Sequence, residues 1–223
     1  MKIFAVLPVY NENPEKLSQL LEKLKNFVDE VVVVDDGSKT VISNQLTGNK
    51  GKIVILRHQI NRGQGAALQT GTDYAIREGA DIIVHLDSDG QHRPEDIPAL
   101  IRPIQEDKVD FVFGSKFLGQ YNKIPWTKKY IIVPIARIIN YIFTGLELSD
   151  AHNGMRAFSA KVAHEVYIAQ DKMAHNTEYS YLVKKNNIKY TEVPVKVIYH
   201  EYGQGIGGGV RILKELVMGK ILK

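Results

Sequence analysis

Five short apolar runs, each followed by polar residues, constrain the fold of this chain most strongly. The runs cover residues 3–7, 31–34, 53–56, 82–86 and 111–113. Their apolar residues are nearly continuous rather than alternating, which is typical of strands buried on both faces of a parallel sheet. The segments between them carry helix signals. This alternation predicts right-handed crossovers and an open, mostly parallel, Rossmann-like α/β sheet with helices on both faces.

The first helix signal follows the first strand directly. Asn13-Pro14-Glu15 is a good helix start, and leucines recur at helical spacing at positions 17, 20, 21 and 24. We predict further helices over residues 65–79 and 97–104. Residues 39–51 are polar and predict a short helix and a loop.

The second half of the chain has a different pattern. Residues 126–146 begin with lysines and continue with apolar residues that Arg137 interrupts, and Pro134 should kink or restart the helix. The segment is too interrupted to cross a bilayer. It could lie in the membrane interface with its apolar face down, or form a core helix or a dimer surface. The sequence leaves these alternatives open.

The C-terminal third of the chain carries further helix and strand signals. We expect short helices over residues 160–166 and 178–186, a final strand over 190–199 and a basic amphipathic helix over 210–222. Pro194 favours an edge position or a bulge for the strand. Residues 203–209 are rich in glycine and should be mobile. We therefore predict one domain over residues 1–200, followed by a glycine-rich loop and a helix over 201–223.

Composition excludes several kinds of site. The 223 residues include no cysteine, which rules out disulfides, zinc–thiolate sites and thiol catalysis. The net charge of +4 suits anionic substrates or an anionic membrane surface, and we expect no nucleic-acid partner. The sequence lacks a signal-peptide pattern and an apolar stretch long enough to span a bilayer. We expect a cytoplasmic protein, with peripheral contact to the inner membrane face left open.

Polar clusters follow all five predicted strands. They are Tyr10-Asn11-Glu12, Asp35-Asp36, Asn61-Arg62-Gly63, Asp87-Ser88-Asp89 and Gly114-Ser115-Lys116. Ligands of open α/β sheets bind outside the carboxyl ends of the strands, so we expect the clusters to converge there. Asp87 and Asp89 provide oxygen ligands suited to Mg²⁺ or Mn²⁺. A cation held by so few protein groups completes its shell with water and substrate phosphates, which predicts a phosphate-bearing substrate.

Taken in order, these motifs resemble those of the family 2 glycosyltransferases, which have the GT-A fold. The resemblance includes the run Asp87-Ser88-Asp89-Gly90-Gln91-His92, the run Asn61-Arg62-Gly63-Gln64-Gly65, and residues 150–158, and it covers roughly residues 1–200. Within the family, the chain looks most similar to the dolichol- or polyprenol-phosphate mannosyltransferases and glucosyltransferases.

The resemblance implies a nucleotide-sugar donor, of the GDP-mannose or UDP-glucose type, and a divalent cation. Donor binding falls to Pro8, Tyr10, Glu12, Asp35, Asp36, Asn61, Arg62, Gly63, Asp87, Ser88 and Lys116. One of Asp35 and Asp36 would accept from the base or ribose, and the other would cap the following turn. Asp87 and Asp89 would hold the metal, with Gln91 as a third ligand. Lys116 stands where similar proteins often carry arginine, so it keeps the charge but loses bidentate geometry.

The implied reaction is direct displacement at the anomeric carbon with inversion. Asp89, Asp150, Arg156 and Glu178 are the candidate catalytic residues, and Arg137, Arg156 and His200 are the candidates for binding the acceptor phosphate. A polyprenyl or dolichyl phosphate is already an anion and needs no general base, whereas a hydroxyl acceptor needs one. The single acid Glu178 favours the lipid phosphate.

Alternative readings remain at this point. The acceptor could be a saccharide hydroxyl or a glycolipid in cell-surface polysaccharide or lipopolysaccharide assembly. A sugar-phosphate nucleotidyltransferase would begin with a glycine-rich, arginine-containing loop, but here the first strand leads into Pro8-Val9-Tyr10-Asn11-Glu12. A catalytically silent homologue is disfavoured by the intact acidic motif. A homodimer is compatible with all of these readings.

Overall fold

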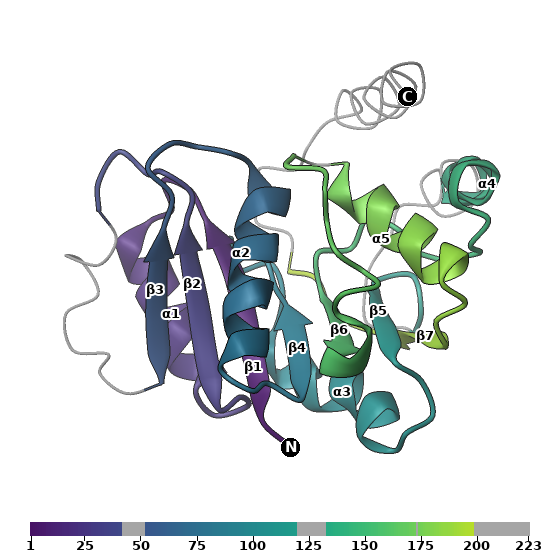
Figure 1. Ribbon diagram of the computed structural model, residues 1–223, viewed down its shortest axis with the longest axis horizontal. Coiled ribbons are helices and arrows are strands. Elements are labelled where there is room, and N and C mark those ends of the chain that lie inside the picture. The colour runs from purple at the N-terminus through teal and green to yellow at the C-terminus, as the bar shows by residue number, and fades with distance from the viewer. Residues whose placement is uncertain (42–51, 120–132, 173, 199–223) are drawn as a thin grey trace.

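The computed structural model describes residues 1–41, 52–119, 133–172 and 174–198. Its centre is a seven-stranded sheet with the order β3-β2-β1-β4-β6-β5-β7, and helices lie on both faces (Figure 1). The strands are β1 (Ile3–Val9), β2 (Glu30–Asp35), β3 (Ile53–Arg57), β4 (Ile82–His85), β5 (Phe111–Ser115), β6 (Arg156–Ser159) and β7 (Tyr190–Pro194). The α/β architecture and the mostly parallel sheet predicted from the sequence are confirmed.

The parallel part of the sheet contains the six predicted strands. β1 lies between β2 and β4 and is parallel to both, and β3 is parallel to β2. β7 pairs in parallel with β5 at the edge of the sheet and ends at Pro194. The edge position predicted from Pro194 is thus confirmed, although the strand is shorter than residues 190–199.

β6 was not predicted, and it is the antiparallel member of the sheet. It lies between β4 and β5 and runs antiparallel to both. Its first residue, Arg156, pairs with His85 on one side and with Phe113 on the other. A four-residue strand covered on both faces has no room for a periodic pattern. Its direction places its beginning at the edge where β4 and β5 end.

Two apolar clusters fill the space on the two faces of the sheet. One contains Leu17 and Leu21 of α1 (Pro14–Leu24) and Leu100 of α3 (Ile97–Gln105). The other contains Ala67 of α2 (Gln64–Arg77) and Tyr179 of α5 (His175–Lys185). Figure 1 shows α2 and α5 in front of the sheet and α1 and α3 behind it. Burial of this apolar surface is the main stabilising contribution.

The close approach of α2 to the sheet depends on a small residue. A Cβ atom at Gly71 would lie 2.3 Å from Cγ1 of Val6 in β1. Because α2 rests so near β1, its N-terminus is fixed close to the carboxyl ends of the strands. This sets the position of the glycine-rich turn that leads into α2.

Most predicted helices are present with shifted ends. The start of α1 is confirmed, because Oδ1 of Asn13 accepts from the backbone N–H groups of Glu15 and Lys16. α5 begins at His175, three residues before the predicted start. The predicted helix over 160–166 is wrong in extent, since only Ala160–Val162 form a short 3-10 helix. The described part of the segment 126–146 contains α4 (Val133–Thr144), with Pro134 in its first turn.

Several predictions lie outside the described residues. They concern most of residues 39–51, residues 126–132, the glycine-rich stretch 203–209 and the C-terminal helix 210–222. His200 lies there as well. Among the described residues, no helix has the length and apolar character required to cross a membrane.

Candidate active site

The polar clusters at the strand ends contact one another along one edge of the sheet. The N–H of Asn11 donates to Oγ of Ser38 at 2.9 Å, which links the ends of β1 and β2. Gly63 N–H donates to Asp36 at 2.7 Å and thereby joins the turn after β3 to β2. Nε2 of Gln64 donates to Oδ1 of Asp87 at 2.6 Å and joins the same turn to β4. These contacts join four of the five predicted clusters, those that follow β1, β2, β3 and β4.

Asp87 is the most constrained carboxylate at this edge. Gln64 donates to one of its oxygens, and Nε2 of His92 lies 3.5 Å from the other. A Cβ atom at Gly154 would lie 1.9 Å from Oδ2, so the backbone leading into β6 passes directly against the carboxylate. Burial alone would raise the pKa of Asp87, but the hydrogen bond and charge of His92 and the charge of Arg156 outweigh it and lower the pKa. Asp87 is therefore held as an anion.

Asp89 and Glu12 form the acidic side of the site. Oδ1 of Asp89 accepts from the backbone N–H of Gln91 at 2.9 Å, which orients the carboxylate at the turn. Burial raises the pKa of Glu12, and the neighbouring carboxylates of Asp89 and Asp87 raise it further, against the effects of Lys16 and Ser88. Glu12 thus lies in the negative field of both aspartates. A cation placed there would relieve this repulsion.

The acidic residues fit a divalent cation that receives part of its shell from a substrate. Among the described residues, no three His, Cys, Asp or Glu side chains are grouped closely enough to enclose a metal ion by themselves. A magnesium-type site with two carboxylates and substrate phosphates does not need such a group. Asp87 and Asp89 are the residues that would hold the cation, and the negative field at Glu12 supports this position.

Asp35 and Asp36 are buried and serve the turns around them. Asp35 caps its turn by accepting from the N–H of Ser38 at 2.9 Å, and it forms an ion pair with Arg57 at 2.9 Å. Asp36 accepts from the N–H groups of Arg62 and Gly63 and contacts Nδ1 of His58 at 2.7 Å. The predicted capping role therefore belongs to Asp35. Asp36 fixes the turn before α2 rather than facing outward.

The turn before α2 is enclosed by a second loop, residues 168–172. Gly63 has a φ of +117°, a backbone conformation that favours glycine. Added Cβ atoms at Gly63 and Gly65 would lie 2.3 and 2.0 Å from the backbone oxygens of Asp171 and Gln170, respectively. The backbone N–H of Ala66 donates to the oxygen of Asp171 at 3.2 Å. Both positions therefore need glycine, because any side chain would collide with the backbone of the second loop.

Arg62 and Asn61 occupy the outer side of this turn. Both are exposed, and Nη2 of Arg62 lies 3.5 Å from Oδ1 of Asp171. An exposed pair at this distance contributes little to stability. The guanidinium of Arg62 is therefore accessible to an anionic ligand.

Arg156 lies beneath the site, with its guanidinium buried. Its Nη2 donates to the backbone oxygen of Asn153 and to Oδ1 of Asn176, and its cation lies 4.7 Å from the ring centre of Tyr179. Nε and Nη1 are buried and have no hydrogen-bond partner among the described residues. Burial lowers the pKa of Arg156, and the nearby anions Asp87 and Asp150 counteract this. The charge of Arg156 in turn lowers the pKa of Asp87.

Lys116 and Asp150 form a second charged pair beside the end of β5. Nζ of Lys116 lies 3.2 Å from Oδ1 of Asp150, and the backbone N–H of Lys116 donates to Oδ2. Asn153 also donates to Asp150, at 2.9 Å. The carboxylate of Asp150, a candidate catalytic acid, is therefore surrounded by donors of the protein itself.

Glu178 and Arg137 bind partners outside the acidic cluster. Glu178 accepts from the backbone N–H groups of Ala169 and Gln170, at 3.2 and 2.8 Å. Arg137 is exposed on α4 and forms an ion pair with Glu147 at 2.9 Å. Pro8 is buried in β1, whereas the side chain of Tyr10 is 48% exposed and available to a ligand.

The sequence model of the family described as Glycosyl transferase family 2 matches residues 4–167, which is most of the chain. This chain belongs to glycosyltransferase family 2. It is 33% identical to a UDP-N-acetylglucosamine–dolichyl-phosphate N-acetylglucosaminyltransferase of Methanococcus voltae, over 99% of this chain and 98% of that protein. It is 26% identical to an undecaprenyl-phosphate mannosyltransferase of Micrococcus luteus, over 94% of this chain and 89% of that protein.

Solved structures agree with the family assignment at the level of the fold. Glucosyl-3-phosphoglycerate synthase from Mycobacterium tuberculosis, in complex with Mn²⁺, uridine-diphosphate-glucose and phosphoglyceric acid, superposes with a TM-score of 0.68. The match covers 97% of this chain and 77% of that one, at 18% identity. The GT-A fold of this glycosyltransferase is thereby shown, and the strand-end cluster is its candidate active site.

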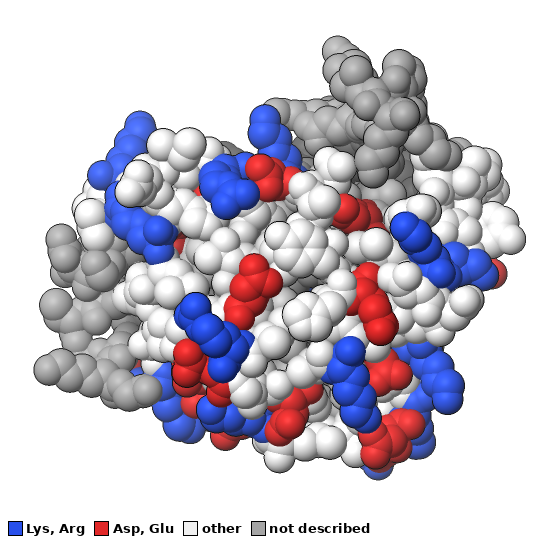
Figure 2. Space-filling model, in the orientation of Figure 1, with Lys and Arg blue, Asp and Glu red and all other residues white. Residues whose placement is uncertain are grey.

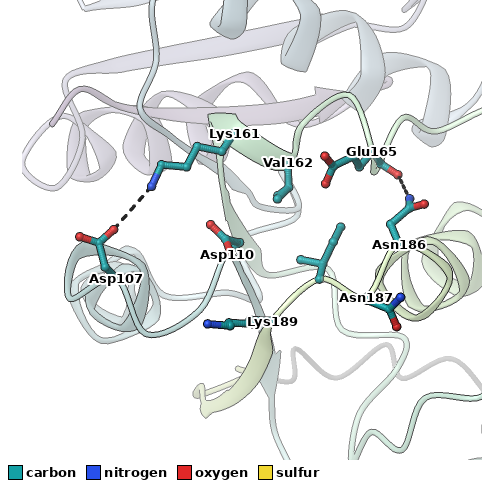
Figure 3. Close-up of a pocket in the computed structure, with 9 residues that line it drawn as sticks. Asp107, Asp110, Lys161, Val162, Glu165, Asn186, Asn187 and Lys189 are labelled. Atoms are coloured by element: carbon teal, nitrogen blue, oxygen red, sulfur yellow. Dashed lines mark hydrogen bonds and ion pairs between the residues drawn. The ribbon is translucent and has the colours of Figure 1, made fainter.

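Other surfaces of the glycosyltransferase look different from this edge. On the face shown in Figure 2, the described Lys and Arg side chains are interspersed with Asp and Glu. A pocket of about 570 Å³ lies at the other end of the strands, where β5 and β7 begin (Figure 3). Asp110 and Lys189, which precede these two strands, line it. It is remote from the carboxyl ends of the strands.

Sequence reasoning assigned no role to four residues that shape the site. Gln64, His92 and Gly154 contact Asp87 or restrict its space, and Tyr179 covers the buried Arg156. The first three lie within the motifs that carried the family resemblance. The contacts of Gln64 and Gly154 cross from one strand end to another, so motif position alone could not reveal them.

Proposed function

We propose that this glycosyltransferase transfers a sugar from a nucleotide-sugar to a polyprenyl or dolichyl phosphate, with inversion at the anomeric carbon and with a divalent cation. The proposal depends on one observation: both candidate bases already accept hydrogen bonds from the protein itself. Glu178 accepts from two backbone N–H groups, and Asp150 accepts from Lys116 and Asn153. An acceptor that is already ionised needs neither acid as a base.

The names of relatives support the same acceptor class. The Methanococcus voltae protein is named for dolichyl phosphate and the Micrococcus luteus protein for undecaprenyl phosphate. They differ in sugar, since one name specifies N-acetylglucosamine and the other mannose. The donor sugar of this chain is therefore tested with UDP-N-acetylglucosamine beside GDP-mannose and UDP-glucose.

The proposed reaction is a single displacement. An oxygen of the lipid phosphate attacks the anomeric carbon while the bond from that carbon to the diphosphate oxygen breaks, and the nucleoside diphosphate leaves with the electron pair. Asp87 and Asp89, with Gln91, would hold the cation, which when bound neutralises charge on the leaving diphosphate. Tyr10 would contact the base, and Arg62 and Lys116 would contact the phosphates.

The test measures transfer by the purified chain from each of the three donors to polyprenyl phosphate, to the same polyprenol without phosphate and to a saccharide acceptor. We expect a sugar–phosphate–lipid product of inverted configuration, formed with Mg²⁺ or Mn²⁺ and abolished by EDTA. Asp89→Ala should remove the activity, and Glu165→Gln, a change on an exposed acid that lines the pocket beside Asp110 and Lys189, should keep it. Transfer to the saccharide hydroxyl alone would replace this proposal with the polysaccharide alternative.

We also propose that α4 brings the domain, residues 1–200, to the membrane that holds the acceptor. Ile138, Tyr141 and Ile142 recur at helical spacing, and their side chains are 60, 57 and 67% exposed. Apolar and aromatic residues on one helix face suit a membrane interface. Co-sedimentation with anionic vesicles should fall for Ile138→Ser/Ile142→Ser. A dimer surface would instead make the same variant monomeric, which light scattering detects.

A further inference from the structure

The strongest unassigned feature is the contact chain that leads from Glu178 to Asp87. Glu178 is half-buried on the first turn of α5, and both of its oxygens face the backbone of the neighbouring loop. It accepts from Ala169 at 3.2 Å and from Gln170 at 2.8 Å. A carboxylate that accepts two backbone N–H groups holds a loop in place by charge-assisted hydrogen bonds.

The loop held by Glu178 is the one that encloses the turn before α2. The backbone oxygens of Gln170 and Asp171 occupy the space that side chains at Gly65 and Gly63 would need. The N–H of Ala66 donates to Asp171. A movement of this loop therefore changes the position of the turn.

The position of the turn before α2 sets the orientation of Gln64. Gln64 is the first residue of α2 and lies between Gly63 and Gly65. Its Nε2 donates to Oδ1 of Asp87 at 2.6 Å, a short bond to a carboxylate that we assign to the metal and the donor. Groups that orient metal ligands in this way affect metal affinity by about 10–100-fold.

We propose that Glu178 is a positioning residue that acts on Asp87 through loop 168–172 and Gln64, and that it does not act as a general base. This inference rests on the proposed function in one respect only, the assignment of Asp87 to the metal and donor site. It gives a reason for an acid at this point of a transferase whose acceptor is already ionised. It also explains why the turn carries a glycine on each side of Gln64.

The structural part of the inference is tested without any substrate. Hydrogen exchange in the full chain should show faster exchange of the Ala66, Arg62 and Gly63 amides in Glu178→Ala. The change should be smaller in Glu178→Gln, because the amide oxygen can still accept one bond. Glu165→Gln is the matched control, an acid-to-amide change on an exposed residue that lines the pocket beside Asp110 and Lys189. Unchanged exchange at these three amides in Glu178→Ala would overturn the inference.

The functional part is tested by calorimetry with Mn²⁺ alone and with Mn²⁺ and the nucleotide-sugar, in the absence of acceptor. We expect Glu178→Ala and Gln64→Ala each to weaken binding by about 10–100-fold. The affinity of the double variant should be little lower than that of the weaker-binding single variant, because both residues act along one route. If the fold-losses in affinity of the two single variants multiply in the double variant, the two residues act independently and the proposal is refuted.

Steady-state kinetics separate positioning from base catalysis. A positioning role predicts a raised apparent constant for metal and donor and an unchanged shape of the kcat–pH profile in Glu178→Ala. Loss of kcat with unchanged donor and metal affinity, and loss of one limb of the profile, would show a base instead. A wild-type chain that binds the donor but does not use polyprenyl phosphate would refute the acceptor proposal and leave this inference standing.

Discussion

The Gly154→Ala substitution tests most directly whether the position of Asp87 controls activity. The backbone of Gly154 does not adopt a positive φ, so alanine meets no backbone strain there, and the effect is steric. The new Cβ would lie 1.9 Å from Oδ2 of Asp87, where an ordinary contact begins at 3.4 Å. The carboxylate must therefore move by about 1.5 Å. A shift of that size breaks its 2.6 Å bond to Gln64 and exceeds the tolerance of roughly 0.2 Å for a metal ligand.

Misplacement by about 1 Å at a reacting centre costs about a hundredfold in rate. We therefore expect kcat/KM of Gly154→Ala to fall by about a hundredfold or more, which corresponds to roughly 2.7 kcal/mol of transition-state stabilisation. Overpacking should also lower the free energy of unfolding by about 1–3 kcal/mol. The assay is sugar transfer at saturating metal, combined with urea unfolding followed by circular dichroism.

Gly79→Ala is the matched control for this substitution. Gly79 has a φ of +79° and nothing within 4 Å of an added Cβ, so alanine there costs roughly 1–2 kcal/mol through the backbone alone. It should lose stability without losing activity. A folded Gly154→Ala protein with kcat/KM within about threefold of wild type would refute the argument that Asp87 needs this geometry.

His175, Asp36 and Arg156 each provide a further prediction. Burial is the main reason that the pKa of His175 is lowered from 6.5 to about 4, so the unfolded state takes up the proton first. The free energy of unfolding should fall by up to about 3 kcal/mol from pH 6.5 to pH 4, less steeply in His175→Gln; equal slopes in urea titrations would contradict this. In Asp36→Asn an NH₂ group replaces one accepting oxygen, so one backbone N–H of the turn before α2 loses its acceptor. The free energy of unfolding, measured with urea, should fall by about 1–3 kcal/mol. Arg156→Met removes a charge that lowers the pKa of Asp87, so the acid limb of Mn²⁺ binding should move to higher pH, and an unmoved limb would exclude this field effect.

The central layers of the fold could be predicted because they depend on local patterns. Continuous apolar runs identified β1 to β5, and Asn13 with Pro14 identified the start of α1. Each of these signals resides in adjacent residues and reflects burial or capping at that place. β6 has no such signal, because four residues that are paired on both sides do not show a period. The prediction of a short helix over 160–166 failed for the related reason that the chain there turns after one 3-10 segment.

The candidate site was predictable as a set of strand ends but not as a set of contacts. The sequence places Asp87 and Asp89 after an apolar run, and parallel strands bring such ends to one edge. It does not show which side chains turn inward. One of Asp35 and Asp36 was expected at the base or ribose and the other at the turn; Asp35 caps its turn, and Asp36 accepts from Arg62 and Gly63. A buried carboxylate needs hydrogen-bond donors, and the backbone N–H groups of a tight turn need acceptors. Here the carboxylate of Asp36 and the N–H groups of the turn before α2 bind each other.

The antiparallel strand has the greatest consequence for the chemistry. If β6 were parallel to its neighbours, Arg156 and Gly154 would lie at the far edge of the sheet from Asp87. Because it runs the other way, its beginning presses the backbone of Gly154 against Asp87 and buries the charge of Arg156 behind it. The charge lowers the pKa of Asp87, while Gly154 from one side and Gln64 from the other restrict its position. One reversed strand thus supplies both the electrostatic and the steric definition of the carboxylate on which the proposed transfer depends.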